Sequence, residues 1–304
     1  MKTILLFCLT LSTLTCYDVF GQTSIAPHQW IVKLKVVDDE NQPVSGADAW
    51  VAYYLPSSTD QSSDVNNPAS DKIGGLTDEN GVFTASHEDT GSISLGLHVR
   101  KEGYYPTDVI HEFAKFRDSD TDKWSPNITL VLKKIVKPIP MYAKRILGAP
   151  SVLNQPMGYD LIAGDWVAPY GKGANTDIIF TIQKTAKDTE FVVTFPNSDD
   201  GIQEFPVSYK ITEGSALRSP HEAPKNGYQS KLIRTSANSG ENKCYFIRVK
   251  SASAEGALYG KMYGDPMNFC YLLNPEPNSR NVEFDPKKNL IKNFRLFAER
   301  VYTP

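Results

Sequence analysis

The segment 158–177 contains the side chains best suited to bind a ligand. An indole or phenol ring can stack on the apolar face of a sugar, while carboxylates accept hydrogen bonds from its hydroxyls. Two carboxylates held about 5–9 Å apart could also hydrolyse a glycosidic bond. The alternative is a turn-rich loop in which Trp166 fills the core and the glycines only shape the bend. The candidate residues are Asp160, Asp165, Trp166, Tyr170, Lys172 and Asp177.

A run of alternating aspartates suggests a cation site. Asp118, Asp120 and Asp122 resemble the start of a calcium-binding loop, in which side-chain oxygens converge on the ion. The pattern then breaks, because Lys123 stands where that loop needs a glycine and Thr129 stands where it needs a bidentate glutamate. Calcium is the one cofactor that the sequence suggests, and the alternative is a solvated acidic loop.

Signatures of the common catalytic centres are absent from the sequence. His87, His111 and His221 each precede a glutamate, but none of them begins the His-Glu-x-x-His motif of zinc hydrolases. The chain also lacks the Gly-x-Ser-x-Gly elbow of esterases and the glycine-rich loops that bind nucleotides. These absences favour a non-catalytic protein.

The first residues have the pattern of an export signal. Lys2 precedes an apolar stretch at 4–14 that is too short to span a bilayer, and we expect cleavage between Gly21 and Gln22. Cys16 lacks the flanking residues of a lipidation site. No later stretch reaches the roughly 18 apolar residues of a membrane span, so we expect a soluble mature protein in the periplasm or outside the cell. The net charge of −3 argues against a nucleic-acid partner.

Two cysteines remain after this expected cleavage. Cys244 and Cys270 lie in strand-like runs, and an even pair in an exported protein is a disulfide candidate. Closing that loop would stabilise the fold by about 3–4 kcal/mol. The alternative is two buried free thiols.

Alternating apolar residues predict strands along most of the chain. In the first third, alternation runs over 30–37, 47–53, 92–100 and 127–132, and an Asn-Gly pair at 80–81 marks a tight hairpin turn. Short strands at this spacing indicate a β-sandwich.

Three pieces of this region together resemble the carboxypeptidase regulatory-like domain. They are Val-Val-Asp-Asp-Glu-Asn-Gln-Pro-Val-Ser-Gly-Ala at 36–47, Thr-Asp-Glu-Asn-Gly-Val-Phe at 77–83 and Lys-Glu-Gly-Tyr-Tyr at 101–105. The resemblance implies an immunoglobulin-like, transthyretin-like (prealbumin-like) β-sandwich over residues 28–135, with an accessory role and no catalytic residues of its own. The sequence departs from this pattern by an insertion at 106–126.

The remainder is predicted to form a second unit, whose family the sequence does not name. A proline-containing passage at 136–150 is predicted to be an extended linker. Residues 151–304 contain further alternating runs separated by turns, and apolar residues at helical spacing over 289–301 predict a short C-terminal helix. The predicted fold class is therefore all-β, with two successive sandwiches.

Three functions are compatible with these observations. The first is an exported, non-catalytic binding or scaffold protein that binds carbohydrate or a cell-surface partner. The second is a secreted hydrolase that cleaves polysaccharide with the carboxylates of segment 158–177. The third is a structural component of a surface assembly, which would expose large apolar patches. The oligomeric state does not follow from the sequence.

Overall fold

We describe the 304-residue chain from a computed structural model. The structure describes residues 28–54, 71–89, 94–112, 127–206, 213–235, 243–265 and 268–304. The predicted signal peptide with its cleavage site, and the acidic run at 118–122, lie outside the described residues. Within them the protein is all-β, as predicted, and the helical residues form only two short 3₁₀ turns, η3 (Pro286–Lys288) and η4 (Phe297–Glu299).

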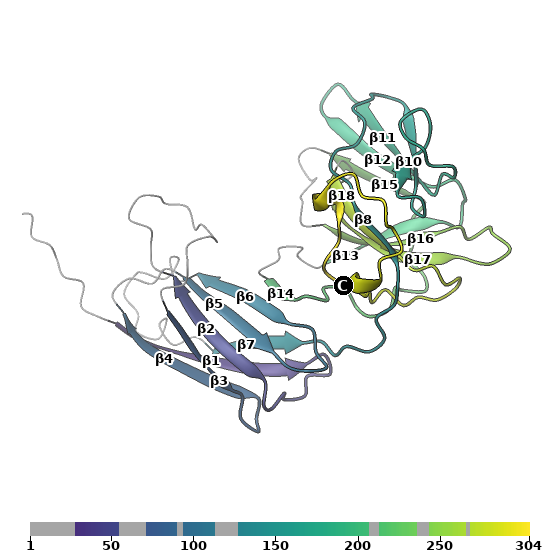
Figure 1. Cartoon of the computed structure of the whole chain (residues 1–304). Coiled ribbons are helices and arrows are strands. Elements are labelled where there is room, and N and C mark those ends of the chain that lie inside the picture. The colour runs from purple at the N-terminus through teal and green to yellow at the C-terminus, as the bar shows by residue number, and fades with distance from the viewer. Residues whose placement is uncertain are drawn as a thin grey trace, which may run out of the picture.

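The first unit is a sandwich of two sheets (Figure 1), with strand orders β4-β1-β7 and β14-β6-β5-β2-β3. Alternating apolar side chains from both sheets meet in one core, where Trp30, Leu34 and Leu97 are fully buried. This confirms the inward face predicted from the alternation in this region. The strands are β1 (His28–Asp38), β2 (Asp48–Tyr54), β3 (Asp71–Leu76), β4 (Val82–Asp89), β5 (Ser94–Arg100), β6 (Thr107–Glu112), β7 (Asn127–Leu132) and β14 (Glu213–Ser215).

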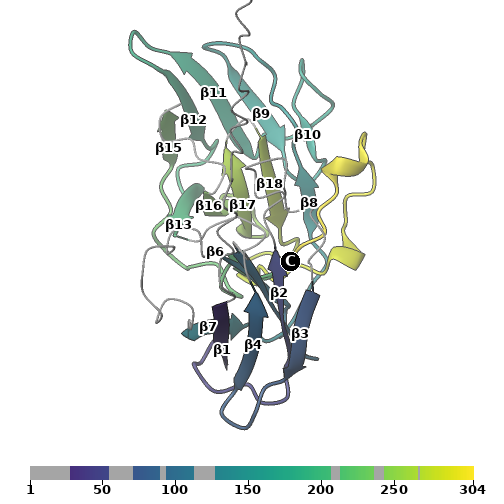
Figure 2. The same ribbon diagram turned by 90° about the vertical axis from the view of Figure 1, so that its left-hand side faces the viewer.

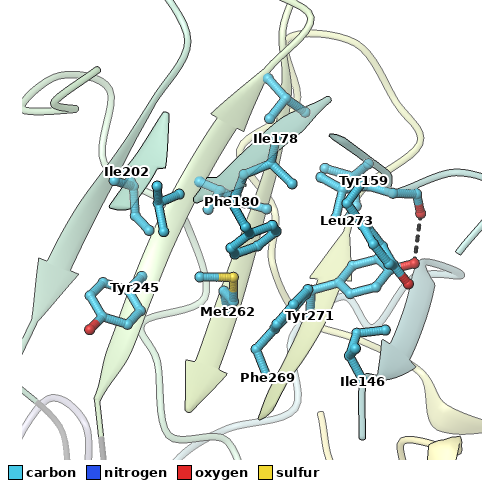
Figure 3. Close-up of a cluster of buried hydrophobic side chains, with 14 of the residues drawn as sticks. Ile146, Tyr159, Ile178, Phe180, Ile202, Tyr245, Met262, Phe269, Tyr271 and Leu273 are labelled. Atoms are coloured by element: carbon cyan, nitrogen blue, oxygen red, sulfur yellow. Dashed lines mark hydrogen bonds between the residues drawn. The ribbon is translucent and has the colours of Figure 1, made fainter. Parts of the chain in front are cut away.

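The second unit packs two five-stranded sheets face to face (Figure 2), with orders β10-β9-β11-β12-β15 and β13-β16-β17-β18-β8. Figure 3 shows the core between them, in which Tyr159 and Phe180 of the first sheet meet Phe269 and Tyr271 of the second. The strands are β8 (Tyr142–Arg145), β9 (Pro156–Asp160), β10 (Asp165–Trp166), β11 (Ile178–Lys184), β12 (Thr189–Thr194), β13 (Gly201–Phe205), β15 (Lys231–Thr235), β16 (Cys244–Val249), β17 (Leu258–Asp265) and β18 (Asn268–Leu273).

The sheet that contains β16, β17 and β18 is covered on both faces. Its second face packs in another core against Val282, Phe284 and Val301 of the C-terminal segment. Strands that are buried on both faces need apolar residues at consecutive positions. This explains why β16 and β18 read as continuous apolar runs, Cys-Tyr-Phe-Ile and Phe-Cys-Tyr-Leu-Leu.

The chain passes between the two units more than once. Strand β14 lies far along the sequence, among the strands of the second unit, yet it pairs antiparallel with β6 and forms the edge of the first unit's sheet. Beside it, the Lys133 Nζ donates hydrogen bonds to the backbone oxygens of Arg218 and Ser219. The second half of the chain therefore completes the first sandwich.

The predicted linker at 136–150 is wrong over part of its length. Strand β8 lies inside it and pairs antiparallel with β18, and Met141 and Ala143 are fully buried. Extended backbone, which the prolines favour, is also the conformation of an edge strand. The preference for extended backbone, from which we predicted a linker, is therefore met by a strand of the second unit.

The predicted C-terminal helix is also wrong. Residues 289–301 run in extended and turn conformations, with only the 3₁₀ turn η4. Asn289 exchanges side-chain hydrogen bonds with the backbone of Ala143, which holds the segment along β8. Ile291 and Val301 are buried in two different cores, so their helical spacing does not mark one face of a helix.

Candidate functional site

The side chain of Asp160 organises the predicted ligand-binding segment by accepting hydrogen bonds from the backbone of that segment. Asp160 ends β9, is 2% exposed, and its carboxylate accepts hydrogen bonds from four backbone N–H groups at 2.8–3.1 Å. These donors belong to Ile162, Ala163, Ala174 and Asn175, which lie on both arms of the loop. A buried carboxylate that accepts four backbone hydrogen bonds has a structural role, because both its charge and the donors around it would cost free energy without these bonds.

The other two aspartates of the segment are engaged in a similar way. Asp177 is 3% exposed, accepts a hydrogen bond from the backbone N–H of Leu161 and forms an ion pair with the Lys250 Nζ at 2.6 Å. Burial raises the pKa of Asp177 against the lowering effect of Lys250. Asp165 accepts hydrogen bonds from the backbone of Trp166 and Lys172, and from the Arg295 guanidinium.

Trp166 fills the core, as the structural alternative for this segment predicted. The indole is 7% exposed and packs edge to face on Tyr159 and Phe180, with ring centroids 5.0 and 5.6 Å apart. A ring enclosed in this way cannot stack on a sugar. A Cβ at Gly171 would lie only 2.3 Å from the Trp166 carbonyl oxygen, so the glycine is needed where the loop closes on the tryptophan.

The outer residues of the segment are the ones that reach solvent. The Tyr170 hydroxyl donates a hydrogen bond to the Gln155 side chain at 3.1 Å, and Lys172 is exposed. The structure thus gathers the six predicted residues around one hairpin, but it does not turn them toward a common cleft. The carboxylates bind backbone amides of the loop, and the indole anchors the loop in the hydrophobic core.

A small polar cavity of about 90 Å³ lies behind this hairpin. Two ion pairs border it, Lys144 with Glu299 at 3.3 Å and Arg295 with Asp165 at 3.1 Å. Tyr159 also lines it, and the buried hydroxyl of this residue has no hydrogen-bond partner among the described residues. The C-terminal segment, which carries Arg295 and Glu299, closes the cavity, and its charges are already paired.

A larger and more open groove lies on the first unit and was missed from the sequence. Its volume is about 740 Å³, and its lining includes Asp48, Arg100, Lys101, Glu102 and Tyr104. Asp48 and Arg100 also point to the outer face of the sheet, as the alternation in β2 and β5 requires. One feature of the sequence could have located this groove: polar and aromatic side chains occupy the outward positions of β2 and β5, whose inward positions are apolar.

A stacked network continues this groove across the outer face. The rings of Trp50 and His98 stack with centroids 5.1 Å apart and planes 14° from parallel. The His98 Nδ1 and the Arg100 guanidinium each lie 2.7 Å from the same Asp108 oxygen. Although burial alone would raise the pKa of Asp108, these two hydrogen bonds lower it. Trp50, His98 and Arg100 are half-buried, so the network borders solvent.

The predicted disulfide is wrong. Cys244 and Cys270 are both buried and free. Cys244 of β16 pairs with Tyr263 of β17, which in turn pairs with Cys270 of β18. The two thiols therefore share a face but are separated by two strand spacings, roughly 9–10 Å, beyond the ~7 Å that a disulfide spans between Cα atoms.

Within the ranges given above, no three His, Cys, Asp or Glu side chains converge in a way that could hold a metal ion. In that same part of the chain, no helix is long and apolar enough to cross a membrane.

Comparison with known proteins assigns no family. No family profile matches the chain, and no curated protein sequence is significantly similar to it. Among solved structures, 3-chlorocatechol 1,2-dioxygenase from Rhodococcus opacus 1CP is 16% identical, with 38% of this chain and 63% of that chain covered and a TM-score of 0.26. This chain therefore spans less than two thirds of the dioxygenase.

Two pilins are similar over more of the chain. A variant of the shaft pilin SpaA from Lactobacillus rhamnosus GG is 8% identical, with 84% of this chain and 99% of that chain covered and a TM-score of 0.26. The major pilin SpaD from Corynebacterium diphtheriae is 10% identical, with 83% and 56% covered and a TM-score of 0.28. Similarity at this level does not assign a function.

Proposed function

We propose that this chain is an exported, non-catalytic binding or scaffold protein, in which the second unit holds the first sandwich in a fixed orientation. The observation that carries this proposal is the addition of β14 to the sheet of the first unit. A peptide segment that joins a sheet contributes main-chain hydrogen bonds along its length and fixes direction as well as distance. A flexible tether between independent domains would not need such a strand.

Buried polar contacts beside β14 support the same role. The Glu283 carboxylate of the second unit is 1% exposed and accepts a hydrogen bond from the Tyr105 hydroxyl of the first unit at 2.8 Å. The same carboxylate accepts hydrogen bonds from the backbone N–H groups of Val136 and Lys137. We further propose that the first unit is related to the carboxypeptidase regulatory-like domain, whose accessory role agrees with this arrangement.

The geometry gives less support to a polysaccharide hydrolase. Such an enzyme needs two carboxylates that face an open cleft, one of them free to exchange a proton. Asp160 and Asp177 are buried and hydrogen-bonded to backbone amides, and Asp165 is paired with Arg295. Calcium binding by Asp118, Asp120 and Asp122 stays a prediction, because these residues lie outside the described ranges.

One observation favours a structural role in a surface assembly as a second candidate. Leu296, Phe297 and Tyr302 of the C-terminal segment are 58%, 73% and 57% exposed. The ring centroids of Phe297 and Tyr302 lie 5.7 Å apart, so the two rings form one exposed aromatic surface, and the Arg300 guanidinium lies 5.4 Å from the centre of the Phe297 ring. A contact between copies at this surface would appear in light scattering as an oligomer that the Phe297→Ser substitution dissociates.

A retention assay tests the non-catalytic role. The mature chain, residues 22–304, is incubated with a panel of insoluble polysaccharides and with envelope fractions, and both retention and new reducing ends are measured. We expect retention without the release of reducing ends. Release that the Asp165→Asn substitution abolishes would overturn the proposal in favour of the hydrolase.

A further inference from the structure

The outer face of the first unit carries one row of side chains across five strands. The strand register aligns Gly74 of β3 with Trp50 of β2, then with His98 of β5 and Asp108 of β6, and finally with Gly214 of β14. The row therefore begins and ends with a residue that has no side chain. Its three central members form the stacked network described above.

This network fixes the orientation of the indole. His98 covers one face of Trp50, and Asp108 holds His98 through the Nδ1 contact. The Arg100 guanidinium lies 5.1 Å from the centre of the indole, and its bond to Asp108 places it on the β5 side of that ring. Each member limits the rotamers of the next, so the indole is preorganised before any ligand arrives.

The opposite face of Trp50 is directed toward β3, where it meets no side chain from Gly74. The separation of the Trp50 and His98 rings is close to the spacing between strands, so the ring planes stand upright on the sheet. Gly74 is exposed on the edge strand, and a Cβ at that position would lie 3.3 Å from the Trp50 Cβ. The register thus places a position without a side chain beside the indole, and we call this opening above Gly74 the Trp50 notch. Leu76, 69% exposed, and Lys72, also exposed, are the neighbouring outward residues along β3.

Polar groups of both signs lie next to this notch. Asp48 is the next outward residue to Trp50 on β2, and it pairs in register with Leu76 on one side and Arg100 on the other. The adjoining groove adds Lys101 and Glu102. Because carboxylates and cations alternate there, the surface offers donors and acceptors without a strong net field. Such a lining suits a neutral ligand that is rich in hydroxyl groups.

We propose that the Trp50 notch and the adjoining groove form a carbohydrate-binding site. A pyranose ring of a neutral oligosaccharide stacks its apolar C–H face on the free face of Trp50 above Gly74. Its hydroxyls bind Asp48, Arg100 and Glu102, and the open groove accepts the neighbouring sugar residues. This inference rests on the proposed binding role, and it moves the site from the 158–177 segment of the second unit to the first unit.

The test measures binding of the mature chain to neutral glucan, xylan, mannan and chitin oligosaccharides, first on an array and then by titration calorimetry. We expect Trp50→Ala to weaken the binding by about tenfold or more, equivalent to ~1.4 kcal/mol. Gly74→Thr keeps the indole but fills the notch, and should weaken the binding similarly. Ile233→Ala, a change at an exposed apolar residue of β15 in the second unit, is the matched control and should leave affinity unchanged.

The possible failures of this test are distinguishable. Far-UV circular dichroism and the melting temperature establish that each variant is folded, and Trp50→Phe retains an aromatic wall if Trp50→Ala does not fold. Oligosaccharide binding that all the variants keep would overturn this site and leave the binding role intact. An array that captures none of the oligosaccharides would overturn the carbohydrate inference, whereas the binding role is judged separately by retention on envelope fractions.

Discussion

One buried carboxylate, that of Glu283, links the two units beside the β14 pairing, and its removal is the sharpest test of the scaffold. Glu283 accepts hydrogen bonds from the Tyr105 hydroxyl at 2.8 Å and from the backbone N–H groups of Val136 and Lys137 at 2.9 and 2.6 Å. The substitution Glu283→Ala removes both carboxylate oxygens and with them all three hydrogen bonds. The Tyr105 hydroxyl is then left buried between the units.

The expected loss of stability follows from these three bonds. A hydrogen bond to a charged group contributes about 1.5–3 kcal/mol, and a buried donor that loses its partner costs a further ~1–3 kcal/mol. Removing the carboxylate also relieves the cost of burying its charge, which offsets part of the loss. We expect a net decrease of about 3–4 kcal/mol in the free energy of unfolding. That is a large share of the ~5–15 kcal/mol by which folded domains are usually stable.

Urea unfolding at neutral pH, followed by circular dichroism, measures this loss. Tyr105→Phe removes one of the three bonds and should cost about 1.5–3 kcal/mol. The double variant should cost less than the sum because the two residues share that bond. Glu276→Ala, a change at an exposed glutamate seven residues earlier in the chain, should alter stability by less than ~0.5 kcal/mol. A loss below ~1 kcal/mol for Glu283→Ala, or strict additivity with Tyr105→Phe, would refute the reasoning.

Three further outcomes are expected. Burial raises the pKa of Cys244 to about 11 and that of Cys270 to about 12, so neither thiol should react with a thiol reagent until the protein unfolds. In a denatured, non-reduced sample both thiols should react, and a disulfide-bridged product would contradict the free pair. Burial lowers the pKa of Lys261 to about 7 from 10.5. Above pH 7 the unfolded chain therefore holds the extra proton, and stability should rise between pH 7 and 9 by up to ~1.4 kcal/mol per unit. Lys261→Met should flatten that rise in urea titrations, and an unchanged slope would count against a buried neutral amine. Asp160→Ala leaves four backbone donors without their acceptor and should lower the unfolding free energy by about 3 kcal/mol in the same assay; a change within ~0.5 kcal/mol would mean that the loop holds without it.

Local sequence pattern accounts for much of the fold. Alternation predicted that Leu95, Leu97 and Val99 point inward while His98 and Arg100 point outward, and the structure confirms each of these. The pleat of a strand sends successive side chains to opposite faces, so this information is contained in a few neighbouring residues. The all-β class follows from the same pattern repeated along the chain.

The candidate site was only partly accessible from the sequence. The structural alternative for 158–177, a turn-rich loop with Trp166 in the core, agrees with the structure, but the same residue types serve a binding loop and a self-bonded loop equally well. The distinction depends on where Trp166 lies relative to Phe180 and on which amides reach Asp160. The first is decided by packing against β11, which follows later in the chain, and the second by the way the two arms of the loop close around Asp160.

The sequence by itself determined which residues alternate, where tight turns fall and that the chain builds sandwiches. Only the tertiary structure decided that β14 completes the first sheet, that β17 separates Cys244 from Cys270, and that Trp50, His98 and Asp108 form one row. The physical reason is that a side chain's face is set by its immediate neighbours, whereas its partners across a sheet are set by the register of strands that are distant in the sequence.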